Sequence, residues 1–298
     1  MKNFNEVYQK TYEEVKTKLN ERPPKKFYQT TNFKIFFVLG IIILFFAIYF
    51  KITFLFVGYC IIAIIAYIAI DSSQKNAEFK AIVIPALVRN YDEHLSFSKF
   101  GSIHAGQYNA AKFESYEIFN AEDSIKGLLD GYIPFNMSNI LTQTTSRDED
   151  GHTTYYTVFS GLFAEITLSK NTNADIFVHS DKGLVGKLFQ SSNKIEMDSQ
   201  EFEKSFDVTA TDKIKAMQLL TSDVMADLLD FKSKTKKAFE ISIRGNKLYF
   251  RFHCGNVFEK ATFKDFLDFG TLNEYYNYLN FSCEVSKKIF NLVKETEL

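Results

Sequence analysis

Two adjacent apolar stretches dominate the pattern near the start of the chain. Residues 35–50 contain thirteen Ile, Leu, Phe or Val in sixteen positions, residues 52–70 contain eleven in nineteen, and Lys51 is the one charge between them. A single helix over both stretches would be about 54 Å long, whereas the hydrocarbon core of a bilayer is about 30 Å thick. The pattern therefore predicts a two-helix transmembrane hairpin over residues 34–70 that turns near Lys51, with a re-entrant loop as the alternative.

Basic residues flank this hairpin on both sides. Lys and Arg accumulate in the cytoplasmic flanks of membrane spans, and the connecting turn offers only Lys51. We therefore expect a cell-membrane protein with two spans, with both termini cytoplasmic and with the lipid bilayer as a partner. The flanking basic residues are Lys16, Lys18, Arg22, Lys25, Lys26 and Lys34 before the hairpin, and Lys75, Lys80 and Arg89 after it.

The segment before the hairpin has the period of a helix. Apolar residues recur at helical spacing over residues 3–20, and the pair Pro23-Pro24 ends the pattern. The polar face mixes acidic and basic residues, which favours packing on protein over lying on lipid. Residues 1–33 are thus predicted to be an amphipathic helix and a basic linker, followed by the hairpin at 34–70 and a cytosolic domain at 71–298.

Helical and strand-like patterns mix in the predicted domain. A helical stripe covers residues 74–90, and the strand-like runs that follow are rich in β-branched and aromatic residues. Gly245-Asn246 and the acidic loop 147–151, closed by Gly151, are typical hairpin connections. We therefore expect an α+β fold with an antiparallel, hairpin-rich sheet and flanking helices. The predicted strands are 124–134, 135–145, 153–168, 175–179, 194–197, 239–244 and 247–253.

A long helix is predicted at the C-terminal end. Thr271 and Glu274 have the spacing of a capping box, and apolar or small residues then recur at alternating gaps of four and three. This stripe could form the seam of a coiled coil, but it includes a Ser and a Cys over three heptads, so we favour a helix docked on its own domain. The stripe consists of Leu272, Tyr276, Leu279, Cys283, Ser286, Phe290 and Val293.

Charge and cysteine content exclude two classes of protein. The whole chain has 35 Lys plus Arg against 36 Asp plus Glu, and residues 71–298 carry 26 basic and 32 acidic side chains. A nucleic-acid-binding protein needs a clustered basic surface to neutralise phosphates, so no nucleic-acid partner is expected. Three cysteines are too few for a disulfide framework, and they lie in an apolar stretch, a strand-like run and a helix-like run, which fits free thiols.

Several sequence runs resemble a known family. They are residues 79–88, Thr142-Gln143-Thr144-Thr145 with the acidic loop that follows, residues 157–163, residues 195–206, Ala210-Thr211-Asp212 and Leu219-Leu220-Thr221. Together they are similar to the bacterial family of uncharacterised membrane proteins called domain of unknown function 3137, over most of residues 71–260. The resemblance implies a membrane-anchored cytosolic α+β domain without an assigned activity. Ala210 stands where the family has glycine, so no role of that glycine transfers.

No motif in the sequence indicates catalysis or a cofactor. The five histidines are scattered, and neither HExxH nor Cys-x-x-Cys occurs, so no metal site is expected. Residues 183–187 lack the glycine spacing of a phosphate loop, and Ser160-Gly161 lacks the frame of a serine hydrolase. We therefore assign no catalytic, cofactor-binding or metal-ligating residue.

Five residues are candidates for a functional surface. Thr211 and Asp212 precede a predicted helix, where they can cap its free N–H groups or help to bind an anion. Glu203 lies in a segment dense in carboxylates and could act as an acid or base. Tyr155 and Tyr156 could form a docking face on a strand, although neighbours on a strand point to opposite faces, so one of them is expected in the core.

The sequence favours a binding function over catalysis. Our hypothesis is a membrane-anchored cytosolic binding or scaffold module with a protein partner, and the alternative is a membrane-bound hydrolase of unrecognised type. An enzyme requires acid, base or nucleophile side chains that converge in a concave site, whereas a docking module requires an exposed surface. Convergence of Asp212, His253 and the carboxylates around Glu203 in one pocket would favour the hydrolase.

Overall fold

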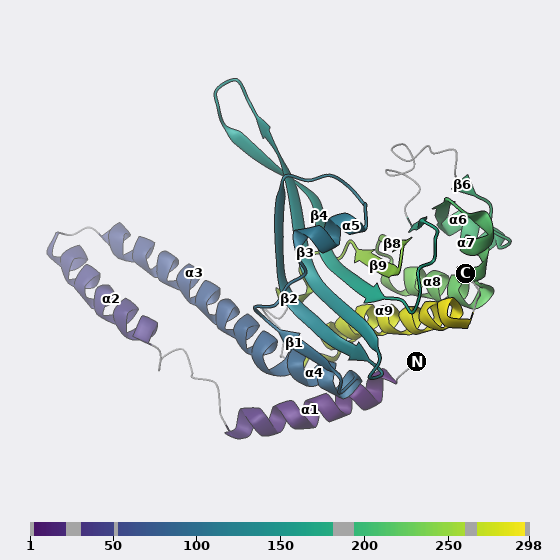
Figure 1. The fold of residues 1–298 in the computed structure, drawn as a ribbon. Coiled ribbons are helices and arrows are strands. Elements are labelled where there is room, and N and C mark those ends of the chain that lie inside the picture. The colour runs from purple at the N-terminus through teal and green to yellow at the C-terminus, as the bar shows by residue number, and fades with distance from the viewer. Residues whose placement is uncertain (1–2, 22–30, 51–52, 181–193, 260–266, 296–298) are drawn as a thin grey trace.

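The computed structural model describes residues 3–21, 31–50, 53–180, 194–259 and 267–295 (Figure 1). Within these ranges, nine strands form one antiparallel sheet in the order β1-β2-β3-β4-β9-β8-β5-β7-β6. The predicted α+β fold with an antiparallel, hairpin-rich sheet is confirmed. The strands are β1 (Leu95–Ser98), β2 (Ile118–Leu129), β3 (Ile133–Arg147), β4 (Thr153–Thr167), β5 (Ile176–His179), β6 (Lys194–Ile195), β7 (Asp207–Ala210), β8 (Phe239–Arg244) and β9 (Lys247–Phe252).

Helices precede the sheet, connect its strands and end the chain. The first three are α1 (Phe4–Glu21), α2 (Thr31–Tyr49) and α3 (Thr53–Glu78), and α3 continues through a π-helical turn (Phe79–Val83) into α4 (Ile84–Tyr91). Thr221 caps α8 by accepting a hydrogen bond from the Val224 N–H. The others are α5 (Ala105–Ala110), α6 (Gln200–Ser205), α7 (Lys213–Leu219), α8 (Ser222–Thr235), a 3₁₀ turn (Val257–Glu259) and α9 (Phe269–Glu295).

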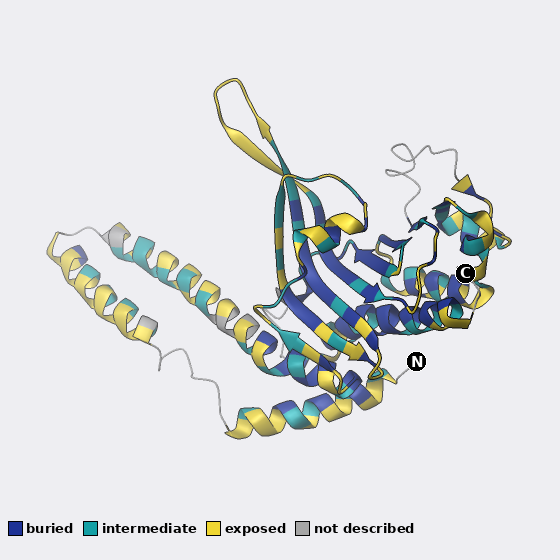
Figure 2. Cartoon of the chain, in the orientation of Figure 1, coloured by how far each residue is buried: buried dark blue, intermediate teal, exposed yellow. Residues whose placement is uncertain are grey.

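The predicted transmembrane hairpin is wrong. The two apolar stretches do form a pair of helices, α2 and α3, whose large apolar side chains are mostly exposed (Figure 2). However, no helix in the described ranges has the length and apolar character needed to cross a membrane. Lys34 lies within the 19 residues of α2, and α3 ends in the polar run 71–78. The two-span membrane localisation with both termini cytoplasmic is therefore wrong too, and the turn at residues 51–52 lies outside the described residues.

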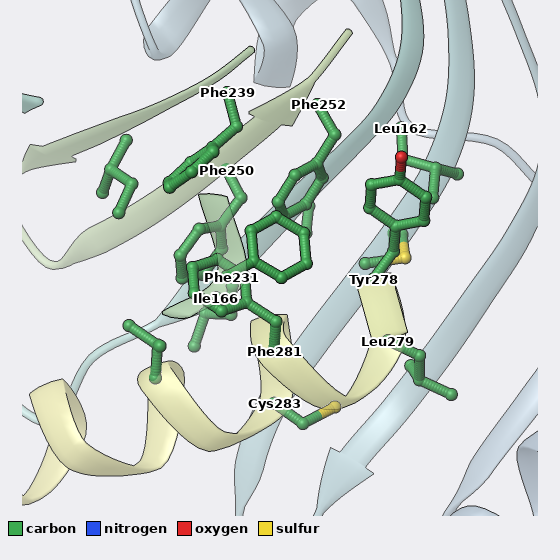
Figure 3. Packing of buried hydrophobic residues seen from close by; sticks show 14 of the residues in the cluster. Leu162, Ile166, Phe231, Phe239, Phe250, Phe252, Tyr278, Leu279, Phe281 and Cys283 are labelled. Atoms are coloured by element: carbon green, nitrogen blue, oxygen red, sulfur yellow. The ribbon is translucent and has the colours of Figure 1, made fainter. Parts of the chain in front are cut away.

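The main core lies between one face of the sheet and the helices α4, α8 and α9. Inward-facing strand residues such as Ile166 and Phe250 pack there against α9, whose predicted stripe is buried from Leu272 to Val293 (Figure 3). The helix thus docks on its own domain, as the sequence favours. α1 also joins this core, because Val7 and Val15 are buried in it. We call the opposite side of the sheet, which faces away from α9, the front face.

A smaller apolar cluster lies on the front face. Residues 103–113, including α5, cover the middle of this face, where Tyr108 and Phe113 pack on Phe163 of β4. Side chains alternate between the two faces along each strand, so neighbours such as Leu162 and Phe163 belong to different clusters. The polar residues on this face therefore lie around a small apolar centre.

A buried ion pair connects the helices to the sheet. Lys80 of the π-helical turn places its Nζ 2.5 Å from Oδ2 of Asp123, and both side chains are almost fully buried. Asp123 sits at a β-bulge between Glu122 and Ser124, with a positive φ of 56°. A bulge re-aims the side chain of its extra residue. This bulge directs the Asp123 carboxylate toward the helix, so α3 and α4 are held in one position relative to β2.

Gly161 allows β4 and β9 to approach closely, which gives a first prediction. A Cβ at this position would lie 1.8 Å from the Phe252 carbonyl oxygen and 3.0 Å from the Cys254 nitrogen. Gly161→Ala should therefore lower the free energy of unfolding by about 1–3 kcal/mol, the usual cost of overpacking. Urea denaturation measures this difference. The matched control is Gly106→Ala in α5, where nothing lies within 4 Å of the added Cβ; equal stability of the two variants would contradict the prediction.

Candidate functional site

The hairpin of β3 and β4 extends well beyond the rest of the sheet as a two-stranded arm (Figure 1). Pairing of β2 with β3 ends at Gln143, and pairing of β9 with β4 begins only at Leu162. We define the arm as residues 144–157. It is coloured as almost entirely exposed in Figure 2, and Tyr155 and Tyr156 are 59% and 54% exposed. The expectation that one of the two tyrosines lies in the core is wrong, because no layer of the described residues packs on either face of this part of β4.

The two edges of the arm differ. On the β3 side, Glu117 covers the edge, because its Oε2 accepts hydrogen bonds from the Thr145 N–H at 2.7 Å and from the Thr145 hydroxyl. These hydrogen bonds, that of the side chain first, lower the pKa of Glu117. On the β4 side, the edge of residues 153–159 that faces away from β3 has no hydrogen-bonded strand partner among the described residues. Pairing on this edge resumes where the Gly255 N–H donates to the Ser160 carbonyl at 3.1 Å. The arm therefore has one open edge.

The tip of the arm is acidic and ordered by its own hydrogen bonds. Asp148 Oδ1 accepts from the His152 N–H at 2.8 Å, and the Gly151 N–H donates to the Asp148 carbonyl at 3.1 Å. Gly151 has a φ of 85°, which glycine adopts readily, and the predicted hairpin connection between β3 and β4 is confirmed. With Glu149 and Asp150, the tip carries three carboxylates against the single guanidinium of Arg147. It is therefore complementary to a basic surface.

A second polar feature lies buried on the front face, where β5, β8 and β9 lie side by side. Strand register places His179, Glu240 and Arg251 directly opposite one another. Glu240 accepts from Arg251 Nε, and its oxygens lie 3.3 Å from His179 Nδ1 and 3.2 Å from His253 Nε2. Arg251 in turn contacts Glu114. We call these five residues, with Tyr108, the Glu240 cluster.

Burial and hydrogen bonding act in opposite directions on the Glu240 cluster. Burial opposes ionisation of Glu240, but hydrogen bonds from His179 and His253 and their positive charge outweigh it, so the pKa of this carboxyl lies below its ordinary value. Burial also lowers the pKa of Arg251, and it raises the pKa of Tyr108. Charged groups removed from water must be compensated by such partners. The cluster consequently depends on all of its members.

The Glu240 cluster fixes the cover of the front face. Tyr108 donates to Glu114 Oε1 at 2.6 Å and accepts from Arg251 Nη1 at 3.2 Å. The guanidinium also lies over the rings of Phe113 and Phe159, at 4.5 and 5.0 Å from their centroids. Because Tyr108, Phe113 and Glu114 come from the covering segment, these contacts attach it to the sheet. The geometry thus supports a positioning role for the cluster.

Asp212 caps α7, and the neighbouring Thr211 holds a loop. Asp212 Oδ1 accepts from the Ile214 and Lys215 N–H groups at 2.9 and 3.1 Å, which is the capping interpretation. Thr211 Oγ1 accepts from the Asp175 N–H at 2.9 Å and so joins the loop before β5 to the end of β7. Thr211 and Asp212 therefore both have a structural role in the fold.

The predicted candidate residues do not converge. Glu203 accepts from the Met197 N–H at 2.8 Å in a hollow of about 160 Å³ next to Lys194 and Asp207. Neither Asp212 nor His253 lines that hollow, and the exposed tyrosines lie on the arm. The described residues also contain no group of three or more His, Cys, Asp or Glu side chains that could hold a metal ion. The condition that would favour a hydrolase is therefore not met.

Sequence reasoning missed the Glu240 cluster, although one signal for it was present. With a two-residue connection at Gly245-Asn246, Arg244 pairs with Lys247, and counting outward along both strands places Glu240 opposite Arg251. Opposite charges on directly paired strand positions indicate an interaction. Tyr108 and Glu114 had no such signal, because they lie more than a hundred residues away in sequence from Arg251.

Part of the chain matches a known family. Residues 157–290 match the family model described as Protein of unknown function (DUF3137). The DUF3137 match covers slightly less than half of the chain; it contains β5 to β9 and most of α9, and it begins where the arm ends. It agrees with the predicted resemblance for this segment, whereas residues 71–156 lie outside it. No curated protein matches the chain.

One solved structure shows a weak likeness. It is the crystal structure of the mycobacterial trehalose monomycolate transport factor A, TtfA, with a TM-score of 0.37 and 6% sequence identity. The likeness covers 75% of this chain and 94% of that chain. A TM-score of this size supports no conclusion about shared function.

Proposed function

We propose that this protein is a non-enzymatic binding or scaffold module, and that the arm is its docking element. The observation that carries the proposal is the open edge of β4 at residues 153–159, on an arm that the other described residues leave exposed. Unpaired strand edges are templates for pairing with another chain, and native proteins usually cover them. On the β3 edge of the same arm, Glu117 accepts from the Thr145 N–H. The two edges therefore differ, and a further strand is expected to pair with β4.

The partner of the arm is an extended segment of another protein. Such a segment would add to β4 as a further strand, with backbone hydrogen bonds for affinity and side-chain contacts for specificity. Tyr155 and Tyr156 point to opposite faces of the arm and would contact side chains on both faces of the added strand. The acidic tip at Asp148, Glu149 and Asp150 favours basic residues at the end of the segment that meets it.

Site-specific crosslinking tests this proposal. A photoreactive amino acid at position 156 of the full chain, in cells that naturally make it, should capture one partner, whereas the same amino acid at Ile214, which is 70% exposed on α7, should not. The captured partner is then purified and its affinity for variants is measured. Tyr155→Ser combined with Tyr156→Ser should weaken binding by at least about thirtyfold, because loss of even one tyrosine at the centre of an interface costs about 2 kcal/mol, which corresponds to that factor.

Ile214→Ser serves as the matched control, since it also removes an exposed apolar side chain and should leave affinity unchanged. Backbone pairing is tested separately by methylating alternate amides of the partner segment, which removes hydrogen-bond donors without changing side chains. Equal capture at positions 156 and 214, or full affinity of the double tyrosine variant, would refute docking on the arm.

A further inference from the structure

A hollow of about 480 Å³ lies on the front face at the end of the sheet away from the arm. Its floor is formed by β1 to β4, and Gln107 of α5 contributes to one wall. The volume falls in the range of about 300–1,000 Å³ that is common for sites of small molecules. An exposed antiparallel sheet face is polar by default, so the arrangement of the polar groups decides whether the hollow is more than a solvated surface.

Strand register brings the polar groups of the floor into one row. Lys126 of β2 is paired with Asn136 of β3, and Asn136 is paired with Glu165 of β4. Directly opposite residues have Cβ atoms about 4.5–5.5 Å apart, so these three side chains are neighbours. In the next row Leu128 is paired with Pro134. The floor therefore has a polar row beside an apolar pair.

The polar row offers hydrogen-bond donors. Glu165 Oε1 already accepts from Lys247 Nζ at 2.9 Å and from Gln107 Nε2 at 3.2 Å. Asn136 Oδ1 accepts from the Ser124 hydroxyl at 3.0 Å, which leaves the Asn136 amide N–H groups to donate. Within the described residues Lys126 forms no ion pair. Glu165 Oε1 and Asn136 Oδ1 are thus engaged, while the donors of Lys126 and Asn136 have no hydrogen-bond acceptor among the described residues.

Charge and apolar surface define the ligand. Lys126 and Glu165 both line the hollow, and the Glu165 carboxylate is paired with Lys247 Nζ at 2.9 Å, so among the described residues Lys126 supplies the lining charge that has no ionic partner. Leu128 is 46% exposed beside Lys126, and Pro134 is exposed next to it. We propose that this hollow binds a small monocarboxylate with an apolar part. The carboxylate would accept from Lys126 Nζ and the Asn136 amide, and the hydrocarbon would lie on Leu128 and Pro134.

Equilibrium dialysis of radiolabelled hexanoate against the full chain tests the site. Hexanoate should bind, while unlabelled hexanamide, its neutral analogue, and inorganic phosphate, an anion without an apolar part, should each compete at least about tenfold more weakly than unlabelled hexanoate. A charge-assisted hydrogen bond accounts for a difference of this size. Lys126→Gln should weaken hexanoate binding by at least about tenfold for the same reason.

Lys213→Gln, which removes an exposed lysine on α7, is the matched control and should bind hexanoate like the wild type. Because Lys126 is exposed, its variant is expected to fold, and circular dichroism verifies this. Hexanamide that competes as well as hexanoate, or binding that survives Lys126→Gln, would place the ligand elsewhere on the protein and overturn the proposal. Phosphate that competes better than hexanoate would overturn its choice of ligand. None of these outcomes depends on the arm.

Discussion

Phe281→Ala is expected to destabilise the protein by about 3–5 kcal/mol, the usual cost of removing a buried phenylalanine ring. Phe281 of α9 is 3% exposed, and its ring stacks on that of Phe231 with centroids 3.9 Å apart (Figure 3). It also meets the rings of Phe239, Phe250 and Phe252 at 5.4 to 5.9 Å. These five rings come from α8, α9, β8 and β9. Removing the Phe281 ring therefore takes away the contacts that α9 makes with the other four.

The free energy of unfolding from urea denaturation checks this prediction. Phe100→Ala is the matched control, since Phe100 is 93% exposed and the same change there should stay within about 0.5 kcal/mol. Phe281→Leu refills part of the cavity and should cost less than Phe281→Ala. A cost for Phe281→Ala no larger than for Phe100→Ala would mean that α9 does not depend on this ring cluster.

The apolar stripe of α9 was predictable from the spacing of its residues alone. Its members recur at gaps of four and three, and a helix places such residues on one face that must be covered. The partner of the stripe was not predictable in the same way, because the alternation of apolar and polar residues in β8 shows which face of the strand is buried but not which helix covers that face. Spacing therefore gives the buried face of an element, and tertiary contacts decide what it packs against.

Turn chemistry was used in one place and missed in another. Gly245-Asn246 correctly predicts the hairpin of β8 and β9. The connection of β2 to β3 was placed at residues 134–135, whereas β2 ends at Leu129 and β3 begins at Ile133. Asp130 and Gly131 have positive φ values of 52° and 83°, as an Asp-Gly turn requires. The signal was present, but the apolar run around it was read as continuous strand.

The helices α2 and α3 show what apolar content can and cannot predict about a helix. The pattern correctly predicts two helices in this region, since both stretches are helical in the structure. It does not fix where each helix ends. α3 runs without a break through the polar residues 71–78 and the π-helical turn into the core, where Lys80 is buried against Asp123. Contacts between Lys80 and a residue of β2 depend on tertiary structure, so local hydropathy could not indicate them.

Glu240→Ala should destabilise the protein at neutral pH by about 3–5 kcal/mol, because removing one partner from a buried ionic cluster leaves the other charges uncompensated. Among the described residues, Arg251 would keep only Glu114 as an acidic partner, and His179 and His253 would lose the carboxylate that they share. Glu149→Ala at the exposed tip of the arm is the matched control and should stay within about 0.5 kcal/mol. Urea denaturation measures the free energy of unfolding of both variants. Similar values would show that the Glu240 cluster does not stabilise the fold.

The pH dependence of stability follows from the same carboxyl. The pKa of Glu240 is lower in the folded protein than its ordinary value, so its ionised form stabilises the fold. This contribution is complete above the unfolded pKa of about 4.3 and is lost as the pH falls from there through the folded pKa. Glu240→Gln cannot ionise, so its stability should fall less steeply with acid, and the gap to the wild type should narrow below about pH 4.3. Parallel acid profiles of the two proteins would show that His179 and His253 do not hold Glu240 ionised.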